Sequence, residues 1–273
     1  MLRSAYELEG KPKLLVVDGA GTLFDPGSVV PAYAFQGSFK NALNDDGNPY
    51  CIDVDFSTIM KWMGRDKLEH VKLLLKEPEV LEQFLRKNNR NPTDEDAKRF
   101  YNSFTEQLYP SAAKTEEIVG VKEAAYKLKD AGIPMVMTTG YDRRMVDETR
   151  KKLGWLDDVL LASFTASDVK KGRPAPYLIY HAMEKAGVDN PPYVVNVGDT
   201  KVDTESADNA HMPGIIVTSG SITNREEAEK VNREIGKKHL ILPSLVEIVD
   251  CTLDGTLADR IKELNNFTSS KTS

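Results

Sequence analysis

The chain has 273 residues, of which 40% are hydrophobic and 29% are charged, and its formal net charge at pH 7 is −6. A chain of this length can bury one large core or two unequal ones. The negative balance argues against a nucleic-acid backbone or an anionic membrane as the main partner, although it is compatible with a local basic pocket for a small phosphorylated ligand.

The two cysteines, Cys51 and Cys251, are far apart in the sequence and do not have the spacing of a metal site. They are most simply free thiols in a reducing compartment. The chain has no run long or apolar enough to span a bilayer, and its first 13 residues lack the apolar middle of a secretory signal. We therefore expect a soluble cytoplasmic protein.

The first predicted strand covers residues 14–18 and ends on Asp18. Its apolar, β-branched residues are typical of a strand that is buried on both faces. Asp18 then lies at the carboxyl edge of a sheet, where α/β proteins place their chemistry, and Gly19 and Gly21 let backbone N–H groups approach an anion closely. Taken alone, the segment is also compatible with an Asp-Gly turn whose Asp serves as a cap.

The next segment, from residue 31 to about residue 115, is dense in Lys, Glu, Leu and Phe at helical spacing and has no convincing strand. Residues 77–79 and 94–96 are typical of helix first turns, where acidic side chains are favoured. A helical module inserted after the first strand can cover the carboxyl end of a sheet and exclude water. We therefore predict an all-helical cap over residues 28–115, with hinges near residues 25–31 and 111–119.

After the cap, short apolar runs alternate with helical patterns. The runs cover residues 135–139, 159–163, 194–199, 215–219 and 240–242, and the helical patterns include residues 121–130, 177–187 and 203–209. Strands that alternate with helices form right-handed βαβ units and a parallel sheet. We predict an α/β fold with a Rossmann-like core over residues 1–27 and 116–260, and a disordered polar tail over residues 261–273.

Small polar or basic residues follow two of these strands. Thr138, Thr139 and Gly140 close the second strand, where a hydroxyl and a backbone N–H can hold a phosphoryl oxygen. A Thr that caps the following helix is an equally good explanation of this segment. Lys171 and Arg173 follow the third strand, where a cation held by neighbouring Gly and Pro could pair with a phosphoryl group or with the nucleophile.

Asp199 ends a further strand, and Asp203 lies four residues later at the start of a helix. Carboxylates that gather with Asp18 at one sheet edge repel one another and are costly unless a cation lies among them. Mg²⁺ suits that position because it prefers carboxylate oxygens and bridges to phosphate. Helix capping explains one of these carboxylates but not both together with Asp18.

In this order and spacing, these segments resemble the haloacid dehalogenase superfamily of phosphoryl-transfer enzymes. The resemblance covers most of the chain and implies that Asp18 is a nucleophile that becomes phosphorylated. The other implied roles are phosphoryl contact by Thr138 or Thr139, charge balance by Arg173 with Lys171 nearby, and Mg²⁺ binding by Asp18, the Ala20 carbonyl and Asp199, with Thr200 and Asp203 in support.

Ala20 departs from the phosphatases of this superfamily, whose Asp at this place protonates the departing alkoxide and later activates water. Losing a positioned acid typically lowers the rate by about 10²–10⁴-fold. One branch, the phosphonoacetaldehyde hydrolases or phosphonatases, carries Ala here and cleaves a P–C bond. A carbanion is too basic to leave directly, and a lysine that condenses with the aldehyde solves this problem because the iminium accepts the electrons.

Residues 61–70 resemble the cap motif of that branch, with Met63, Gly64, Lys67 and His70 at the matching places. On a helix, Met63, Lys67 and His70 would lie at i, i+4 and i+7 and so share one face. Burial under a closed lid would lower the pKa of Lys67, whose neutral amine could then attack a carbonyl, while His70 could move protons. Taken singly, a solvated Lys and a packed His and Met are the alternatives.

Other details agree with the branch. Ser28 lies in a segment, residues 27–31, that resembles its linker into the cap, and Tyr141 lies in a Thr-Gly-Tyr sequence whose Tyr reaches the substrate region. Gly19 and Leu23 depart from the residues usual in the branch, and the cap carries a longer polar loop at residues 44–49. A neighbouring clade of phosphonatase-like hydrolases has a similar pattern.

We therefore expect a Mg²⁺-dependent hydrolase that cleaves phosphonoacetaldehyde, or a close aldehyde phosphonate, to acetaldehyde and phosphate. The resemblance also implies a homodimer. A phosphate-ester hydrolase that tolerates Ala20 and a pseudoenzyme that binds a phosphorylated ligand are the alternatives. The expected substrate-binding residues are Ser28, Met63, Gly64, Thr138, Thr139, Gly140, Tyr141, Lys171 and Arg173.

Overall fold

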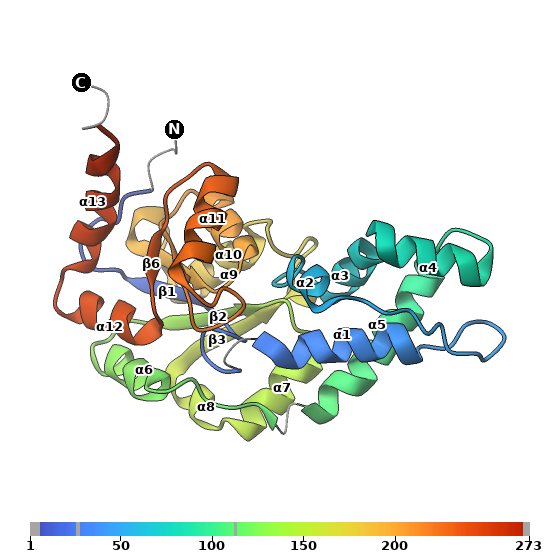
Figure 1. Cartoon of the computed structure of the whole chain (residues 1–273). Coiled ribbons are helices and arrows are strands. Elements are labelled where there is room, and N and C mark those ends of the chain that lie inside the picture. Colours follow the sequence, from blue (N-terminus) through green and yellow to red (C-terminus); the bar gives the residue numbers. More distant parts are fainter. Residues whose placement is uncertain (1–5, 26–27, 112–113, 270–273) are drawn as a thin grey trace.

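The computed structural model describes residues 6–25, 28–111 and 114–269, with the backbone alone at residues 111 and 266–269. Its centre is a six-stranded parallel sheet in the order β3-β2-β1-β4-β5-β6 (Figure 1). The strands are β1 (Leu14–Asp18), β2 (Met135–Thr139), β3 (Leu160–Thr165), β4 (Val194–Gly198), β5 (Gly214–Val217) and β6 (Leu240–Leu242). The α/β fold class and the expected strands are confirmed, with β3 shifted toward Thr165 because residue 159 ends a helix.

Helices cover both faces of this sheet, which explains why β1 is apolar throughout. Leu15 and Val17 face one hydrophobic cluster, to which α6 (Val121–Asp130), α8 (Trp155–Val159) and α12 (Leu245–Leu253) contribute. Leu14 and Val16 point to the other face, where α9 (Tyr177–Ala186) and α10 (Lys201–Asn209) pack. Alternate side chains of a strand point to opposite faces, so a strand covered twice has no polar face. The remaining core helices are α7 (Arg143–Lys152), α11 (Arg225–Ile235) and α13 (Leu257–Ser269).

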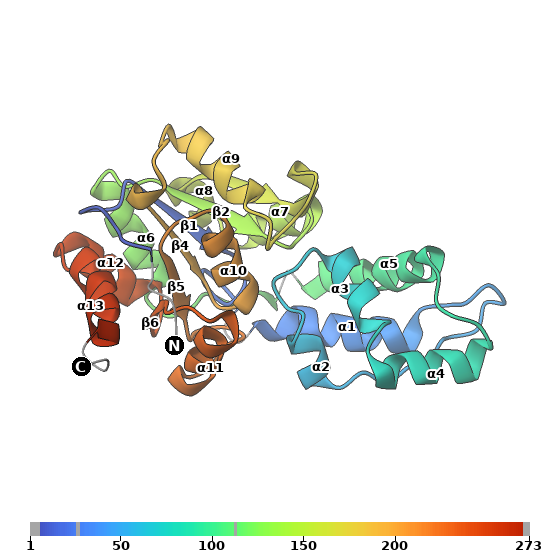
Figure 2. The ribbon, with the colours of Figure 1, turned by 90° about the horizontal axis from the view of Figure 1, so that it is seen from above.

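The expectation of a disordered tail over residues 261–273 is wrong for residues 261–269. These residues belong to α13, which lies on the side of the core away from the inserted helices (Figures 1 and 2). Leu257 and Ile261 are each only 1% exposed, and Leu264 packs against the same cluster. Their i, i+4, i+7 spacing forms an apolar helix face, which the polar residues at the end of the chain obscured. Residues 270–273 lie outside the described residues.

The segment between β1 and α6 is helical, as expected. It contains α1 (Val29–Asn41), α2 (Phe56–Met60), α3 (Lys67–Leu74), α4 (Pro78–Asn88) and α5 (Asp94–Ser111), and it projects beside the core (Figures 1 and 2). α4 and α5 begin where the acidic first turns were predicted. Stacked rings form its centre: Phe35 lies on Phe104 with centroids 4.1 Å apart, and Phe39 lies on Phe100 at 4.4 Å. We refer to residues 28–111 as the cap, and we propose these residues as its outer limits.

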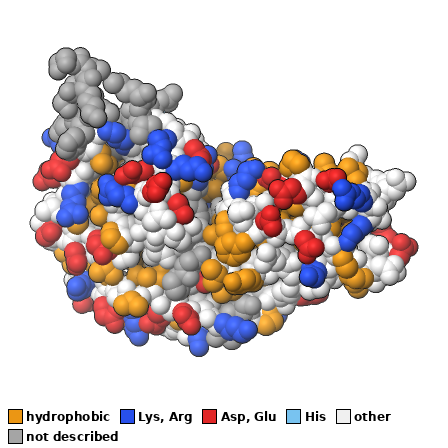
Figure 3. Space-filling view, viewed as in Figure 1, with side chains coloured by type: hydrophobic (Ala, Val, Ile, Leu, Met, Phe, Trp, Pro, Cys, Tyr) orange, Lys and Arg blue, Asp and Glu red, His pale blue; other side chains and the backbone are white. Residues whose placement is uncertain are grey.

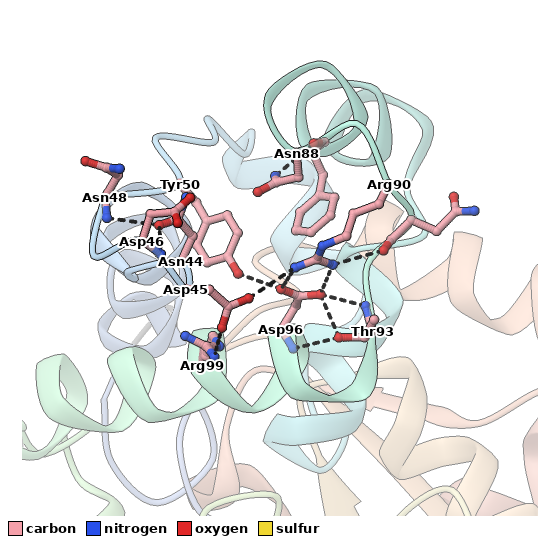
Figure 4. Close-up of polar contacts among 12 residues, drawn as sticks. Asn44, Asp45, Asp46, Asn48, Tyr50, Asn88, Arg90, Thr93, Asp96 and Arg99 are labelled. Atoms are coloured by element: carbon pink, nitrogen blue, oxygen red, sulfur yellow. Dashed lines mark hydrogen bonds and ion pairs between the residues drawn. The ribbon is translucent and has the colours of Figure 1, made fainter.

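A buried carboxylate holds the far end of the cap together (Figure 4). Asp96 is 1% exposed and accepts hydrogen bonds from Tyr50 Oη at 2.6 Å, from both terminal nitrogens of Arg90 and from the backbone N–H of Thr93 at 2.8 Å. Although burial opposes it, these donors hold the pKa of Asp96 well below its usual range. The polar loop at residues 44–49 is joined to this cluster through Asp45, which pairs with Arg90 at 3.9 Å. The loop is therefore linked by an exposed ion pair to the end of the cap that lies away from the sheet.

The surface carries acidic and basic side chains interspersed over both the core and the cap on the face that Figure 3 shows. Within the described ranges, none of the helices has the length and apolarity that a membrane crossing requires.

Candidate active site

The carboxyl ends of β1, β2 and β4 meet beneath the cap, as the sequence pattern predicted. Asp18 ends β1 opposite Thr138 of β2, and Asp199 directly follows β4. Between this sheet edge and the cap lies a cavity of about 20 Å³, which has room for about one water molecule. The cap is therefore closed. The cavity is lined by Asp18, Ala20, Ser28, Pro31, Met63, Gly64, Lys67, Thr139, Gly140, Tyr141, Arg173 and Thr200.

Three buried carboxylates cluster at this edge. Oxygen atoms of Asp18, Asp199 and Asp203 lie within 4.8 Å of one another, and the three residues are 5%, 0% and 2% exposed. Burial, and then the neighbouring carboxylates, raise the pKa of Asp199 far above its ordinary value; burial also raises the pKa of Asp203, against the opposing charge of Arg173. The cluster is short of positive charge, and its donor set of carboxylate oxygens fits Mg²⁺.

The hydrogen bonds show which of these carboxylates retain oxygens that can bind a metal. Asp203 is fully engaged: one oxygen accepts from Arg173, and the other accepts from the Thr200 N–H at 3.0 Å and the Thr200 hydroxyl at 2.5 Å. Arg173 also donates to one oxygen of Asp18 at 2.8 Å. Asp199 Oδ2 accepts from the Ser221 N–H at 2.6 Å, whereas its Oδ1 has only a long contact of 3.4 Å with Thr22. Asp18 and Asp199 therefore retain oxygens for a metal, while Asp203 orients Arg173 and Thr200.

Glycines allow the cap and the core to touch at the cavity. Gly64 has a φ of +88°, and a Cβ there would collide with the hydroxyl of Thr200. A Cβ at Gly140 would collide with the carbonyl oxygen of Arg65. The side chain of any other residue at these two places would hold the cap away from the core, which gives both glycines a role in closure.

Lys67 enters the cavity from the first turn of α3. Its side chain is buried, with Nζ 3.7 Å from the sulfur of Met63 and 5.4 Å from the ring centre of Tyr141. Burial, and then the charge of Arg173, lower the pKa of Lys67 to about 8, against the opposing effect of Asp18. At pH 7 an amine with this pKa is neutral in about one molecule in ten, roughly 300 times more often than an amine with the ordinary value. Lys67 is thus equipped to act as a nucleophile.

Met63 contacts Lys67, but the expectation that both lie on one helix is wrong. Gly64 turns the chain through its positive φ, and Asp66 starts α3 by accepting a hydrogen bond from the Glu69 N–H at 2.9 Å. Met63 therefore lies in the turn before the helix and reaches Lys67 across that turn. The i, i+4 spacing of Met63 and Lys67 does not by itself reveal that Gly64 ends the helical path between them.

His70 lies behind Lys67 and does not line the cavity. It is fully buried, and its ring centre is 4.1 Å from that of Phe35. Burial, and then the charge of Lys67, hold the pKa of His70 well below 6.5, so the ring is neutral. The Ile59 backbone opposes this shift, yet neither ring nitrogen makes a well-formed hydrogen bond to the described residues. In the closed form His70, which belongs to the same helix as Lys67, packs against Phe35 of α1 and does not line the cavity.

The sequence also matches a known protein family. The model of the haloacid dehalogenase-like hydrolases matches residues 12–211. The chain belongs to the haloacid dehalogenase-like hydrolases. The resemblance predicted from the strand-end residues is therefore confirmed.

The relatives of this hydrolase include phosphonoacetaldehyde hydrolases. That of Lysinibacillus sphaericus is 33% identical over 223 residues, which are 80% of this chain and 79% of that protein. That of Bacteroides fragilis is 32% identical over 272 residues, covering 89% of this chain and 99% of that protein. A solved phosphonoacetaldehyde hydrolase-like protein from Oleispira antarctica has a TM-score of 0.78 at 25% identity and covers 97% of this chain and 98% of that chain. A β-phosphoglucomutase from Clostridium difficile shares the fold, with a TM-score of 0.64 at 16% identity over 92% of this chain and 98% of that chain.

Two predicted substrate-binding residues of this hydrolase lie away from the cavity. Lys171 is exposed, and Thr138 is buried within the sheet, whereas the neighbouring Thr139 lines the cavity. Conversely, sequence reasoning missed Pro31 as a wall of the cavity and Ser221 as a donor to Asp199. The Ser-Gly-Ser sequence after β5 was the available signal for Ser221, since small polar residues after a parallel strand mark the functional edge.

A crevice of about 540 Å³ adjoins the cavity of this hydrolase on one side. Met63 and Thr200 line both spaces, and Asp199 also borders the crevice. The crevice lies between cap residues 60–65 and the core helices α10 and α11. It brings solvent close to the carboxylates while the cap is shut.

Proposed function

We propose that this hydrolase uses Mg²⁺ to cleave the carbon–phosphorus bond of phosphonoacetaldehyde, releasing acetaldehyde and phosphate. The observation that carries the proposal is the pairing of Lys67 and Asp18 in one closed cavity whose wall has Ala20 beside the nucleophile. Asp18 is the one carboxylate among the described residues that line the cavity, so no second acid is available there to protonate an alkoxide. The names of the relatives support the same substrate.

The reaction begins on the cap side of the cavity. The neutral amine of Lys67 attacks the aldehyde carbon, and loss of water leaves a protonated imine. The raised neutral fraction of Lys67 makes this step possible at neutral pH. Tyr141 and Met63 enclose the amine and exclude water from it.

The second half of the reaction takes place on the core side. Asp18 attacks phosphorus, the P–C bond breaks, and its electron pair moves into the imine to leave an enamine on Lys67. Arg173, ion-paired with Asp18 at 2.8 Å, orients the nucleophile and balances charge on the phosphoryl group. Mg²⁺ held by Asp18, Asp199 and the Ala20 carbonyl would supply further neutralisation of the phosphoryl oxygens.

Water completes both halves. The enamine takes up a proton to become an imine again, and hydrolysis of that imine releases acetaldehyde and restores Lys67. Hydrolysis of the aspartyl phosphate releases phosphate and restores Asp18. Overall one water molecule is consumed, since the water lost during imine formation is returned during imine hydrolysis.

The test is reductive trapping. The protein is incubated with Mg²⁺ and phosphonoacetaldehyde, reduced with borohydride, and digested for mass spectrometry, while acetaldehyde and phosphate are measured in parallel. We expect the label on Lys67, loss of label and turnover in Lys67→Arg, and both retained in the matched variant Lys72→Arg, which changes a neighbouring lysine of the same helix. A label on another lysine, or turnover without any label, contradicts the mechanism.

A comparison of substrates separates the proposed function from phosphate-ester hydrolysis. We expect cleavage of phosphonoacetaldehyde and only slow hydrolysis of alkyl phosphates, because no second carboxyl group among the described residues lines the cavity to protonate an alkoxide. Fast alkyl phosphate hydrolysis without phosphonoacetaldehyde cleavage would assign a phosphatase instead.

We also propose that the protein is a homodimer. Tyr33 and Phe56 support this because they form an exposed aromatic pair on the cap, 63% and 37% accessible with ring centres 5.9 Å apart. Light scattering on the purified protein measures the mass, and Tyr33→Glu should shift a dimer toward the monomer.

A further inference from the structure

One core carboxylate receives two hydrogen bonds from the cap. Asp142 Oδ2 accepts from the hydroxyl of Tyr109 at 2.8 Å and from the hydroxyl of Tyr101 at 3.3 Å. Both tyrosines belong to α5, where their spacing of eight residues places them on the same face, about 12 Å apart along the helix. Asp142 belongs to the core and directly follows Tyr141.

Asp142 is itself fixed on the core side. Its Oδ1 accepts the Met145 N–H at 2.8 Å, which caps α7, and the positive end of that helix favours the carboxylate. Arg144 lies over the ring of Tyr109 at 4.2 Å and adds a second contact between α7 and α5. The cap tyrosines therefore bind to a preformed acceptor rather than to a mobile surface side chain.

Charge and burial keep this contact intact over the physiological pH range. Burial, and then the charge of Asp142, raise the pKa of Tyr101; burial, and then its hydrogen bond to Asp142, raise that of Tyr109. Both phenols thus remain protonated donors. Hydrogen bonds to a charged acceptor are roughly twice as strong as those between neutral groups. Within residues 28–111 and the described core, no ion pair joins the cap to the core. Polar attraction between them comes from hydrogen bonds to core carboxylates, which are this contact and the bond from Ser28 Oγ to Asp199 at 3.1 Å.

The contact lies next to the site. The N–H of Tyr141 donates to Thr139 Oγ1 at 3.1 Å, so the turn from residue 139 to residue 142 is held by Thr139 at one end and by Asp142 at the other. The Tyr141 ring, carried by this turn, is the neighbour of the Lys67 amine. The closed arrangement therefore places the cap tyrosines on Asp142 and Lys67 against Tyr141 at the same time.

We propose that Tyr101, Tyr109 and Asp142 form a clasp that holds the cap closed and positions Tyr141 against Lys67 during the reaction. These are positioning residues, and the inference rests on the proposed function. The clasp forms only in the closed state, so it raises the fraction of molecules in which Lys67 and Asp18 share one cavity. The apparent affinity for substrate varies with that fraction.

The experiment compares Tyr101→Phe/Tyr109→Phe with Tyr126→Phe. Tyr126 is a matched control because its hydroxyl donates to Asp158 at 2.7 Å within the core, away from the cap. For the double variant we expect KM for phosphonoacetaldehyde to rise about ten-fold with kcat within about two-fold, because saturating substrate restores closure. Small-angle X-ray scattering without substrate should show a larger radius of gyration in the double variant than in the parent. Tyr126→Phe should match the parent in both measurements.

A second variant, Asp142→Ser, removes the charged acceptor but keeps a good cap for α7, and it should reproduce the double variant. Parental KM and parental scattering in the double variant overturn the clasp, as does an equal effect of Tyr126→Phe. A fall in kcat without a change in KM also overturns it, because that pattern indicates a role in the chemical step. If the parent forms no imine with phosphonoacetaldehyde, the proposed function fails, and scattering alone still decides whether the clasp closes the cap.

Discussion

Replacing Lys67 by methionine is expected to stabilise the fold while it abolishes imine formation. Burial lowers the pKa of Lys67 from 10.5 to about 8, so the ammonium group, which water solvates better in the unfolded chain, destabilises the folded state. The difference corresponds to about 3 kcal/mol in the free energy of unfolding, since one pKa unit is worth about 1.4 kcal/mol. Methionine has a similar length and no charge, so it fits the site without this penalty.

The pH dependence has a definite sign. Below about pH 8 the lysine is protonated in both the folded and the unfolded chain, and the destabilisation is complete. Between about pH 8 and 10.5 the unfolded chain binds more protons than the folded one, so the stability of the parent rises with pH. The advantage of Lys67→Met is therefore full at pH 7 and vanishes above about pH 10.5.

Urea denaturation with a chelator present measures this difference at pH 7 and at pH 10, and the chelator removes the contribution of any bound cation. The matched control is Lys129→Met, an exposed helical lysine, whose unfolding free energy should stay within about 0.5 kcal/mol of the parent. Equal stability of Lys67→Met and the parent at pH 7 would show that the amine is well solvated. The argument for a neutral nucleophile would then be refuted.

Three other predictions concern the core. Ala20→Asp restores a carboxyl beside Asp18, and we expect alkyl phosphate hydrolysis to rise about 100-fold in a phosphate-release assay; no gain would mean that position 20 does not limit this reaction. Asp25→Asn should add about 3 kcal/mol to the free energy of unfolding at pH 7, because burial and then Glu116 raise the pKa of Asp25 to about 6 against the effect of the Val30 N–H. The charged carboxylate of Asp25 destabilises the parent fully above pH 6 and less toward pH 4. Denaturation at pH 4 should therefore show no difference between the variant and the parent. Chelation of divalent cations should abolish phosphonoacetaldehyde cleavage and Mg²⁺ should restore it; turnover that survives chelation contradicts the metal assignment.

The strands and the place of the site could be predicted because they depend on local patterns. Four apolar residues in a row in β1 and three in β2 suit a sheet covered on both faces, and the polar residues at the end of each strand must lie at the same edge. Acidic first turns located α4 and α5 because the helix dipole acts within one turn. The helix α13 was missed since its apolar face is spread among polar residues and becomes stable only against α12 and β6.

By itself the sequence determined which groups meet beneath the cap: Asp18 and Thr139 end parallel strands, Arg173 and Asp199 come after parallel strands, and Lys67 lies in a segment of the cap with a matching motif. Only the tertiary structure decided how those groups behave. Burial sets the pKa of Lys67. The hydrogen bonds of Asp203 to Arg173 and Thr200 occupy both of its oxygens, so its role is to orient Arg173. Asp142 accepts hydrogen bonds from two tyrosines that lie more than 30 residues away in the sequence. Charge, solvation and long-range hydrogen bonds depend on what surrounds a side chain in space, and a linear pattern of residues does not contain that information.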